Sequence, residues 1–304
     1  MEVSVIMSTY KEEIFLLKEA IESILNQTYQ DFEFIIILDN PDNKEHIQFI
    51  NSYQDERIRF YINEKNMGLT NSLNKALDLA KGKYICRMDA DDISLPNRIE
   101  KQIKYLETNK YDLIGGLSQM IDEDGNTIYS IKTVPTDFTK IKKCIKYNQV
   151  ISHPTWFGKK EVFDNLNGYR KIPLCEDYDF TLRAILKGYK ISNYNHTILK
   201  YRMTSGSISR SNLFEQYLYA RYITSQYSKG KVTNIEEASK YVQEHNNTKE
   251  ANKYLKANKY FNDALNDIEN KHFLSFIKNG FKLLFASKYY LNKIYRFVMV
   301  TLYS

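Results

Sequence analysis

Three aspartates gather directly after one apolar run of the sequence. Asp89, Asp91 and Asp92 follow Tyr84–Met88, a stretch of strand length. Carboxylates this close repel one another unless a cation or a hydrogen-bond network compensates, and on an extended chain Asp89 and Asp91 point to the same side. Hard oxygen ligands suit Mg²⁺ or Mn²⁺, which leave positions for phosphate oxygens. A solvated acidic turn, with Asp92 or Ser94 capping the next helix, is the alternative that this pattern leaves open.

A second acidic pair, Glu176 and Asp177, stands where a helical pattern begins. A carboxylate at such a position can accept the proton of a hydroxyl nucleophile. Adjacent residues of a helix point about 100° apart, so only one of the two can face a substrate. Acids in a first turn also complement the helix dipole, and taken alone this structural role is the better explanation of the pair.

Alternating strand and helix patterns must position these acids. Runs of strand length predict strands at Glu2–Met7, Phe32–Leu38, Arg57–Ile62 and Tyr84–Met88. Apolar residues at helical spacing predict helices at 14–25, 69–80 and 96–106. Gly82 is predicted to close the second of these helices as a left-handed C′ residue. This alternation is typical of βαβ units and of a parallel sheet covered by helices. In such sheets ligands bind beyond the carboxyl ends of the strands, where Ser8–Tyr10, Asp39 and Asp89–Asp92 lie.

The pattern changes after residue 110. Runs at 113–122 and 127–132 flank Gly125 and predict a hairpin. Helices are predicted near 138–147, 160–166 and 178–187, and short strands near 190–194 and 198–202. Ser205–Ser207 marks a break, and only helical patterns follow from Leu213. We interpret this tail as a helical appendage.

Composition limits the class of protein. The chain has 304 residues, 43% of them hydrophobic and 26% charged, which suits one large or two modest globular domains and excludes general disorder. No apolar run has the roughly 18 residues that span a bilayer. Three cysteines, Cys86, Cys144 and Cys175, are far apart and odd in number, which favours a reducing compartment over a disulfide framework. We therefore expect a soluble, cytoplasmic protein.

The net charge of +6 is concentrated at one end of the sequence. Residues 271–304 contain no acidic residue but carry six basic ones: Lys271, Lys278, Lys282, Lys288, Lys293 and Arg296. Aromatic and aliphatic residues are interleaved with them. Such an amphipathic basic segment can lie on an anionic membrane surface. It can equally pack its apolar face on the rest of the protein and leave the lysines in water, and the sequence leaves both interpretations open.

The order of several short motifs resembles that of family 2 glycosyltransferases. The resemblance covers roughly residues 1–210. The matching stretches are Ser8–Glu12, Ser23–Tyr29, Asp39, Asn66–Leu69, Leu73–Lys75, Gly82–Arg98, Ser152–Pro154, Gly168–Tyr169, Glu176–Phe180, Tyr201–Arg202 and Ser207–Ser209. Each motif is weak singly, but their order is specific.

The resemblance implies a fold, a reaction and partners. It implies an α/β fold of the GT-A type, a mostly parallel twisted sheet with helices on both faces. Residues 1–110 would form the nucleotide-binding half, 111–210 the acceptor half and 211–304 a helical extension. It further implies an inverting enzyme that uses Mn²⁺ or Mg²⁺, a UDP-sugar donor and a glycan acceptor, with a lipid-linked oligosaccharide of a bacterial surface polysaccharide as the most plausible one. We expect no nucleic-acid partner, and a location in the cytoplasm or peripherally on the inner face of the cell membrane.

The resemblance also assigns roles to residues. Asp91 would ligate the metal, and Asp177, or alternatively Glu176, would be the general base. The donor would be bound by eight residues: Thr9, Tyr10, Glu12, Asp39, Asn66, Gly68, Asp89 and Ala90. A carboxylate such as that of Asp39 can accept a hydrogen bond from uracil N3–H. Arg87 is equally well explained as a charge partner of Asp89 or Asp91.

Two departures from the family pattern concern the nucleotide and the metal. Leu38 and Pro41 replace polar or small residues around Asp39, and Thr204 stands where many relatives carry a metal-binding histidine. We expect His153 to make a structural or donor-side hydrogen bond. A sugar nucleotidyltransferase would need a glycine-rich basic loop after the first strand, which Ser8–Glu13 lacks. A non-catalytic sugar-binding protein is the other alternative, and the presence of both acidic motifs argues against it.

Overall fold

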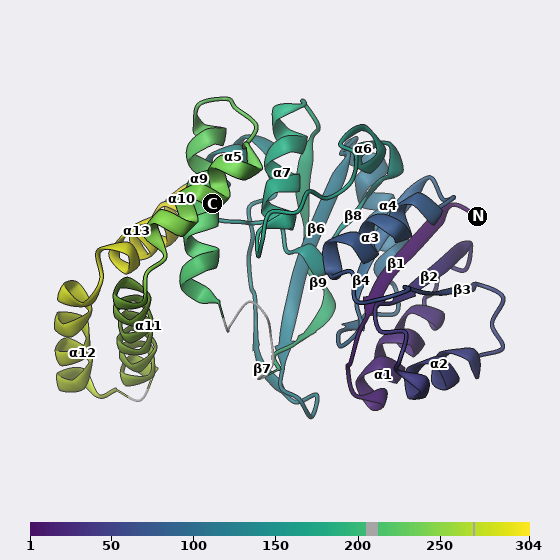
Figure 1. Cartoon of the computed structure of the whole chain (residues 1–304), viewed down its shortest axis with the longest axis horizontal. Coiled ribbons are helices and arrows are strands. Elements are labelled where there is room, and N and C mark those ends of the chain that lie inside the picture. Colours follow the sequence, from purple (N-terminus) through teal and green to yellow (C-terminus); the bar gives the residue numbers. More distant parts are fainter. Residues whose placement is uncertain (205–211, 270) are drawn as a thin grey trace. The chain divides into compact units, whose positions relative to one another are not determined.

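The computed structural model describes residues 1–204, 212–269 and 271–304 (Figure 1). These residues form two compact units. The first contains Met1–Lys142, Gln149–Lys171 and the described residues from Glu176 to Thr204; the second contains Lys143–Asn148, Ile172–Cys175 and the described residues from Asn212 onward. Two short segments from within the expected 1–210 block therefore belong to the second unit.

Strands and helices alternate in the first 110 residues, as the sequence predicts. The elements are β1 (Val3–Thr9), α1 (Ile14–Leu25), β2 (Phe32–Leu38), α2 (Lys44–Asn51), β3 (Ile58–Ile62), α3 (Leu69–Leu79), β4 (Tyr84–Asp89), β5 (Ile93–Ser94) and α4 (Arg98–Asn109). β1 pairs in parallel with both β2 and β4, and β2 pairs in parallel with β3. The predicted parallel βαβ half is confirmed, while α2 was not anticipated.

The second half of this unit extends the same sheet. Its elements are β6 (Leu113–Ile121), β7 (Thr127–Ser130), α5 (Phe138–Cys144), the short 3₁₀ helix η1 (His153–Thr155), β8 (Phe157–Lys159), α6 (Lys160–Asn165), α7 (Glu176–Leu186) and β9 (Ile191–Arg202). The strand order is β3-β2-β1-β4-β8-β6-β9-β5, with β7 paired to β6 as the predicted hairpin. β8 pairs antiparallel to both β4 and β6, so the sheet is mixed, and its parallel pairings are the longer ones.

Helices cover both faces of the sheet. Val5 and Met7 of β1 belong to a buried cluster with Leu17 of α1 and Ile99 of α4. α3 also contacts β1 and β2 but contributes no residue to that cluster, so it lies on the opposite face (Figure 1). This arrangement follows from the strand order, because α3 returns the chain across the sheet from β3 to β4.

Two local predictions were wrong. Gly82 is not a left-handed C′ residue, because α3 ends at Leu79, its C-cap residue Ala80 already has extended backbone, and Gly82 has no positive φ. A Cβ at Gly82 would lie 2.6 Å from the backbone nitrogen of Ser4, so glycine is needed here for close approach to β1. The two short strands predicted near 190–194 and 198–202 are one strand, β9, whose pairing with β6 shifts register between Gly116 and Ser118.

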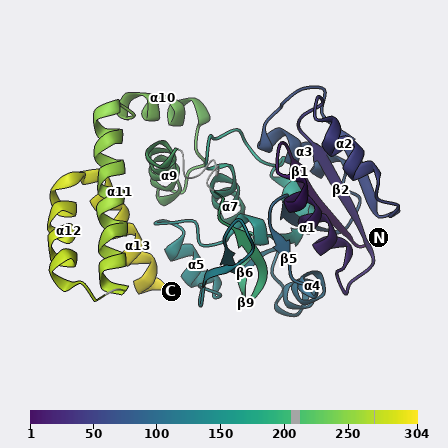
Figure 2. The ribbon, with the colours of Figure 1, turned by 90° about the horizontal axis from the view of Figure 1, so that it is seen from below.

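The second unit is helical, which confirms the predicted C-terminal helical region. Its helices are α9 (Leu213–Ser228), α10 (Ile235–His245), α11 (Thr248–Glu269), α12 (Phe273–Ala286) and α13 (Lys288–Tyr303). α11 and α12 lie side by side (Figure 2). Among the described residues, no helix is both long and apolar enough to cross a membrane. The predicted break at Ser205–Ser207 and the motif match at Ser207–Ser209 lie outside the described residues.

Candidate active site

The carboxyl ends of three parallel strands bring the predicted donor-binding segments together. Thr9 at the end of β1 pairs with Leu38 of β2, and Ser8 pairs with Asp89 of β4. Asp39 directly follows β2, and Asp91 lies two residues after the end of β4. The edge of the sheet at which ligands bind in open α/β folds therefore carries the predicted residues.

Glu12 organises the loop after β1. Its Oε2 atom accepts hydrogen bonds from the Thr9 hydroxyl at 2.6 Å and from the Tyr10 backbone N–H at 2.7 Å. Thr9 is buried, whereas the Tyr10 ring is exposed at the edge of the site. The negative charge of Glu12 also raises the pKa of Asp91, so the loop after β1 lies near the acidic cluster.

Asp39 holds the loop that leads into α3. Its Oδ1 atom accepts from the Asn63 amide and from the Met67 backbone N–H, and its Oδ2 atom accepts from the Gly68 N–H, each at 2.7 Å. Gly68 has φ +81°, which favours glycine, and its N–H also donates to Asn66 Oδ1. The structure thus gives the Asp39 carboxylate a loop-organising role.

The three aspartates after β4 form one cluster. One oxygen from each of Asp89, Asp91 and Asp92 lies within 4.8 Å of the others. Burial, together with the charges of Asp89 and Glu12, raises the pKa of Asp91 to about 7. Arg87, buried in β4, forms an ion pair with Asp89. The charge-partner interpretation of Arg87 is therefore confirmed, with Asp89 as the partner. Ala90, buried between these acids, completes the turn.

Asp92 does not cap the following helix. Its buried Oδ1 accepts a hydrogen bond from the Arg202 backbone N–H at 2.9 Å, and Asn97 is the N-cap residue of α4. Ser94 is not the cap either, because it pairs with Leu199 as part of β5. The capping alternative is therefore wrong, because the Asp92 side chain makes a tertiary contact with β9 instead of capping α4.

Arg202 is the residue that sequence reasoning missed. Its buried guanidinium donates to the backbone oxygens of Asp91, Asp122 and Glu123 at 2.9, 3.1 and 2.7 Å, and it also pairs with Glu19. It thereby fixes the backbone of the acidic turn. The motif Tyr201–Arg202 was the available signal, but nothing in the sequence gave the arginine a partner.

The chemistry of this cluster fits a divalent cation. Asp92 Oδ2 is buried without a hydrogen-bond partner, and burial and the charges of its two neighbours raise the pKa of Asp92 well above its usual range. A cation would relieve both the repulsion and the unsatisfied oxygen. Clustered hard oxygen donors suit Mg²⁺ or Mn²⁺.

The second acidic pair begins α7. Burial and the charge of Asp177 raise the pKa of Glu176 to about 7. Burial also raises the pKa of Asp177, and this rise is opposed by hydrogen bonds from the Tyr178 backbone N–H and the Gln149 amide. Gln149 donates to Asp177 Oδ2 at 3.4 Å and to the Thr181 hydroxyl at 3.0 Å. Gln149, another residue that the sequence did not single out, thus orients Asp177.

Electrostatics connects the two acidic groups. Arg87 lowers the pKa of both Glu176 and Asp177, while Asp89 raises that of Glu176. Charges influence one another in this way only when they are near and poorly screened. The acids after β4 and those of α7 therefore lie within electrostatic reach of Arg87.

His153 is buried and makes the expected structural hydrogen bond. Its Nε2 atom is 2.9 Å from the Tyr169 hydroxyl, and its ring packs edge-on against Trp156. Burial, together with the charge of Arg87, lowers its pKa well below the usual range, so the ring is neutral.

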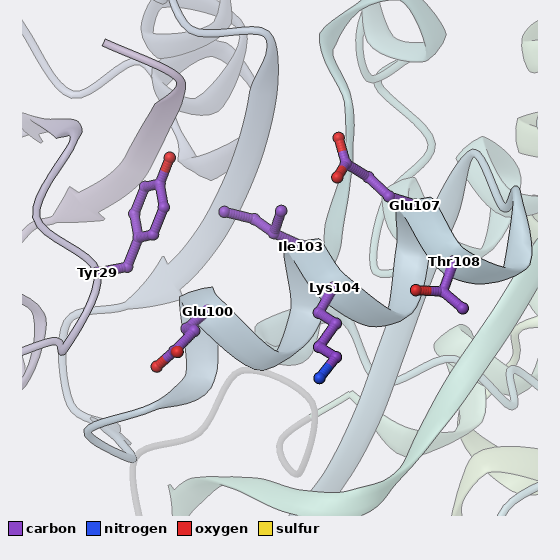
Figure 3. A pocket seen from close by; sticks show the side chains of 6 residues that line it. All are labelled: Tyr29, Glu100, Ile103, Lys104, Glu107 and Thr108. Carbon is purple, nitrogen blue, oxygen red and sulfur yellow. The ribbon is translucent and has the colours of Figure 1, made fainter.

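A surface hollow of about 260 Å³ lies elsewhere in this unit. Five of its lining residues come from α4 and one is Tyr29 (Figure 3). None of the predicted site residues lines it. Its position along the exposed side of α4, away from the strand ends, separates it from the acidic groups.

The chain matches the sequence model of one protein family. The model of glycosyl transferase family 2 matches residues 4–166, more than half of the chain. The chain belongs to this family. The match contains the strands β1–β4 and the acidic cluster, so the predicted resemblance is confirmed.

Curated relatives agree with this membership. An uncharacterized glycosyltransferase of Methanocaldococcus jannaschii is 43% identical over 232 residues, which are 75% of this chain and 80% of the relative. The O-antigen biosynthesis glycosyltransferase WbnJ of Escherichia coli is 35% identical over 238 residues, 77% of this chain and 92% of the relative. Both alignments extend beyond the family match.

Solved structures share the fold. TarS of S. aureus, residues 1–349, in complex with UDP-GlcNAc, superimposes with a TM-score of 0.63 at 18% identity, covering 80% of this chain and 71% of TarS. The mannosyltransferase PcManGT from Pyrobaculum calidifontis, in complex with GDP-Man and Mn²⁺, superimposes with a TM-score of 0.59 at 16% identity. The match covers 79% of this chain and 69% of the PcManGT chain. The predicted GT-A type α/β fold is thus confirmed for this glycosyltransferase.

Proposed function

We propose that this glycosyltransferase moves one sugar from a UDP-sugar to a hydroxyl group of a glycan, with inversion at the anomeric carbon and with Mn²⁺ or Mg²⁺ bound. The observation that carries the proposal is the pair of acidic groups around Arg87. One group fits a cation that neutralises diphosphate, and the other contains a carboxylate that can accept a proton.

The donor would lie across the carboxyl ends of β1, β2 and β4. Thr9, Tyr10 and Glu12 would border the nucleotide. Asp39 would accept a hydrogen bond from uracil N3–H through a carboxylate lone pair that its hydrogen bonds to the loop before α3 do not use. Asn66 and Gly68 would lie beside the base in the loop that Asp39 holds. A bound UDP-GlcNAc in TarS supports a nucleotide-sugar in this fold, while GDP-Man in PcManGT makes the choice of base a matter for experiment.

Asp91 would hold the cation, with Asp89 and Ala90 on the ribose side of the turn. The bound cation would neutralise the charge that develops on the departing nucleoside diphosphate. Arg202 holds the Asp91 backbone and Arg87 holds the Asp89 carboxylate, so both acids are oriented before any ligand binds. The Mn²⁺ in PcManGT supports a metal in this fold. Thr204 replaces the expected histidine, so Asp91 would be the main protein ligand.

Asp177 would accept the proton of the acceptor hydroxyl as that oxygen attacks the anomeric carbon. Gln149 donates a hydrogen bond to its carboxylate, and this bond and the charge of Arg87 oppose the rise in pKa that burial causes. A single displacement of this kind inverts the anomeric configuration. Glu176, the alternative base, has a pKa of about 7 and would be only partly ionised at neutral pH without a cation.

The acceptor would be a lipid-linked oligosaccharide of a surface polysaccharide. The support is the 35% identical relative WbnJ, whose name assigns it to O-antigen biosynthesis. A cytoplasmic location would bring the enzyme to nucleotide-sugars.

An assay of nucleoside diphosphate release over a panel of UDP- and GDP-sugars, which release UDP and GDP respectively, tests this proposal with Mn²⁺, with Mg²⁺ and with EDTA. We expect one UDP-sugar to be preferred and EDTA to abolish release. Proton NMR of the glycoside then reports the anomeric configuration. Metal-independent turnover, or retention of configuration, would contradict the corresponding part of the proposal. No release under any condition would instead favour a non-catalytic sugar-binding protein.

A sugar nucleotidyltransferase is not favoured by the loop after β1. Glu12 occupies the Tyr10 N–H there and adds a negative charge where a triphosphate would need N–H donors. Formation of UDP-sugar from UTP and a sugar phosphate in the same assay would support that alternative.

A further inference from the structure

One side of α12 exposes a continuous row of large apolar side chains. Six residues form this apolar row, each between 56% and 85% exposed: Phe273, Leu274, Ile277, Phe281, Leu284 and Phe285. At 3.6 residues per turn they occupy about a third of the helix circumference. Soluble surfaces seldom expose apolar residues side by side in this way, so the row marks a binding surface.

The opposite side of α12 packs against α11. Leu283 is buried there, and Asn279 donates a hydrogen bond to Asp267 of α11 at 2.8 Å. Asn279 and the centre of the apolar row lie on opposite sides of the helix. The acid nearest to α12 in this contact is therefore turned away from the apolar row, and packing against α11 leaves the row open.

Basic residues accompany the apolar row. Lys278 lies along one edge of it, and the exposed Lys282 lies farther round the helix, with its Nζ over the Tyr260 ring of α11. The exposed Lys271 and Lys288 lie just beyond the two ends of α12. Residues 271–304 contain no acid. The side of the helix that is exposed is thus both apolar and positively charged.

Two of the six basic residues in the segment are turned inward. Arg296 donates to the Tyr147 backbone oxygen at 2.6 Å and to the Thr224 hydroxyl at 3.1 Å. Lys293 lies over the Tyr290 ring, and burial lowers its pKa. The interpretation that counts all six basic residues as surface charge was therefore wrong: these two hold α13 within the helical unit.

We propose that the apolar row of α12 and its four lysines dock on the surface of an anionic lipid bilayer. An amphipathic helix of this kind lies in the plane of the interface, with its apolar side chains about 5–10 Å deep and its lysines among the headgroups. Charge decides between a bilayer and a second copy of this chain, because two such faces would bring lysines against lysines. The surface goes beyond the transfer reaction, and it would hold the enzyme where lipid-linked acceptors lie.

Vesicle flotation of the full chain tests the proposal without any sugar or acceptor. We expect the protein to float with mixed phosphatidylglycerol and phosphatidylcholine vesicles and to stay below pure phosphatidylcholine vesicles. The double substitution Leu274→Glu and Phe285→Glu should lower the partition coefficient at least about tenfold, because it places two charges in the apolar interface. Both side chains are exposed, so far-UV circular dichroism should be unchanged.

Matched controls distinguish binding through this surface from nonspecific adsorption to vesicles. Ile128→Glu with Tyr129→Glu adds the same two charges at exposed apolar positions of β7, and it should leave flotation unchanged. Lys278→Glu with Lys282→Glu should also lower the partition coefficient at least about tenfold, since each lysine near an anionic surface strengthens binding about fivefold. The same charge reversal at the exposed Lys229 and Lys231, in the loop before α10, should lower the partition coefficient much less.

Three outcomes would overturn the proposal. The first is no flotation of the unmodified chain with anionic vesicles. The second is equal flotation of the unmodified chain and the Leu274→Glu, Phe285→Glu variant. The third is a dimer, seen by light scattering, that this variant dissociates while vesicles bind neither protein; the apolar row would then be an interface between copies. Transfer from a UDP-sugar to a soluble acceptor does not enter these measurements, so failure here leaves the proposed reaction standing.

Discussion

The buried Oδ1 atom of Asp92 accepts a hydrogen bond from the backbone N–H of Arg202 at 2.9 Å, across 110 residues of sequence. Arg202 ends β9, and its side chain in turn holds the backbone oxygen of Asp91. The acidic turn after β4 is thus fixed by β9, which pairs with β5 directly after the turn. The geometry of the cation site depends on where β9 ends.

The substitution Arg202→Met should weaken the cation site while leaving its acids in place. It removes the guanidinium bonds to Asp91, Asp122 and Glu123, and we expect Mn²⁺ affinity in the presence of UDP to fall about 10–100-fold, as for other residues that orient metal ligands. Calorimetric titration with Mn²⁺ measures this. Arg59→Met breaks an arginine ion pair with Glu33 at another part of the sheet and is the control. Equal Mn²⁺ affinity in both variants would show that Arg202 serves the fold alone.

Asp91→Asn should abolish metal-dependent turnover. The amide keeps the shape of the side chain but cannot carry the charge that holds the cation. We expect donor binding in Mn²⁺ to weaken and UDP release to fall to background, with an unchanged circular dichroism spectrum. A turnover number near that of the unmodified enzyme would show that another residue holds the metal.

Asp177→Asn should separate binding from transfer. Loss of a general base costs on the order of 10²–10⁴ in rate and does not require loss of donor affinity. We therefore expect calorimetric UDP-sugar binding close to that of the unmodified enzyme and a transfer rate reduced by this factor, whereas Glu176→Gln should lose less. If Glu176→Gln is inactive and Asp177→Asn active, the two roles are exchanged. If both variants are active, the base lies elsewhere.

Glu176→Gln should also stabilise the metal-free protein at high pH. The folded-state pKa of Glu176 is about 7, above its ordinary value of 4.5, so the folded state keeps a proton that the unfolded state releases between these values. Raising the pH through this window therefore lowers the free energy of unfolding. The amide removes this penalty, and we expect a gain of about 1–3 kcal/mol at pH 8.

Urea unfolding in EDTA at pH 8 and at pH 4.5 measures this stability difference, which should shrink at the lower pH. Glu244→Gln, an exposed substitution in α10, should change the free energy of unfolding by less than about 0.5 kcal/mol at either pH. A constant difference between Glu176→Gln and the unmodified protein at both values would contradict a raised pKa at Glu176.

Periodicity in the sequence predicted the elements that carry the site. The bounds of α1 and β2 match their apolar patterns because each buries a regular face against the sheet. The strand ends then place Thr9, Asp39 and Asp89 together, as parallel topology requires.

Tertiary partners could not be predicted in the same way. A local rule makes Asp92 a helix cap, yet a strand more than a hundred residues later uses its side chain. Gln149 is a polar residue in an irregular segment, and only the fold brings it to Asp177. Gly82 follows a helix at the spacing of a C′ residue, whereas close packing on Ser4 is what requires glycine.

The second unit is built from three separate stretches of the chain, and this limits how it can be exchanged with that of a relative. Tyr147 accepts a hydrogen bond from Arg296, and Leu174, two residues before Glu176, accepts one from Gln216 of α9. A chimera that exchanges only the helices after α7 with those of a relative would leave both segments facing foreign side chains. Exchange of the helical unit therefore needs three matched junctions, at 143–148, 172–175 and after β9, instead of one.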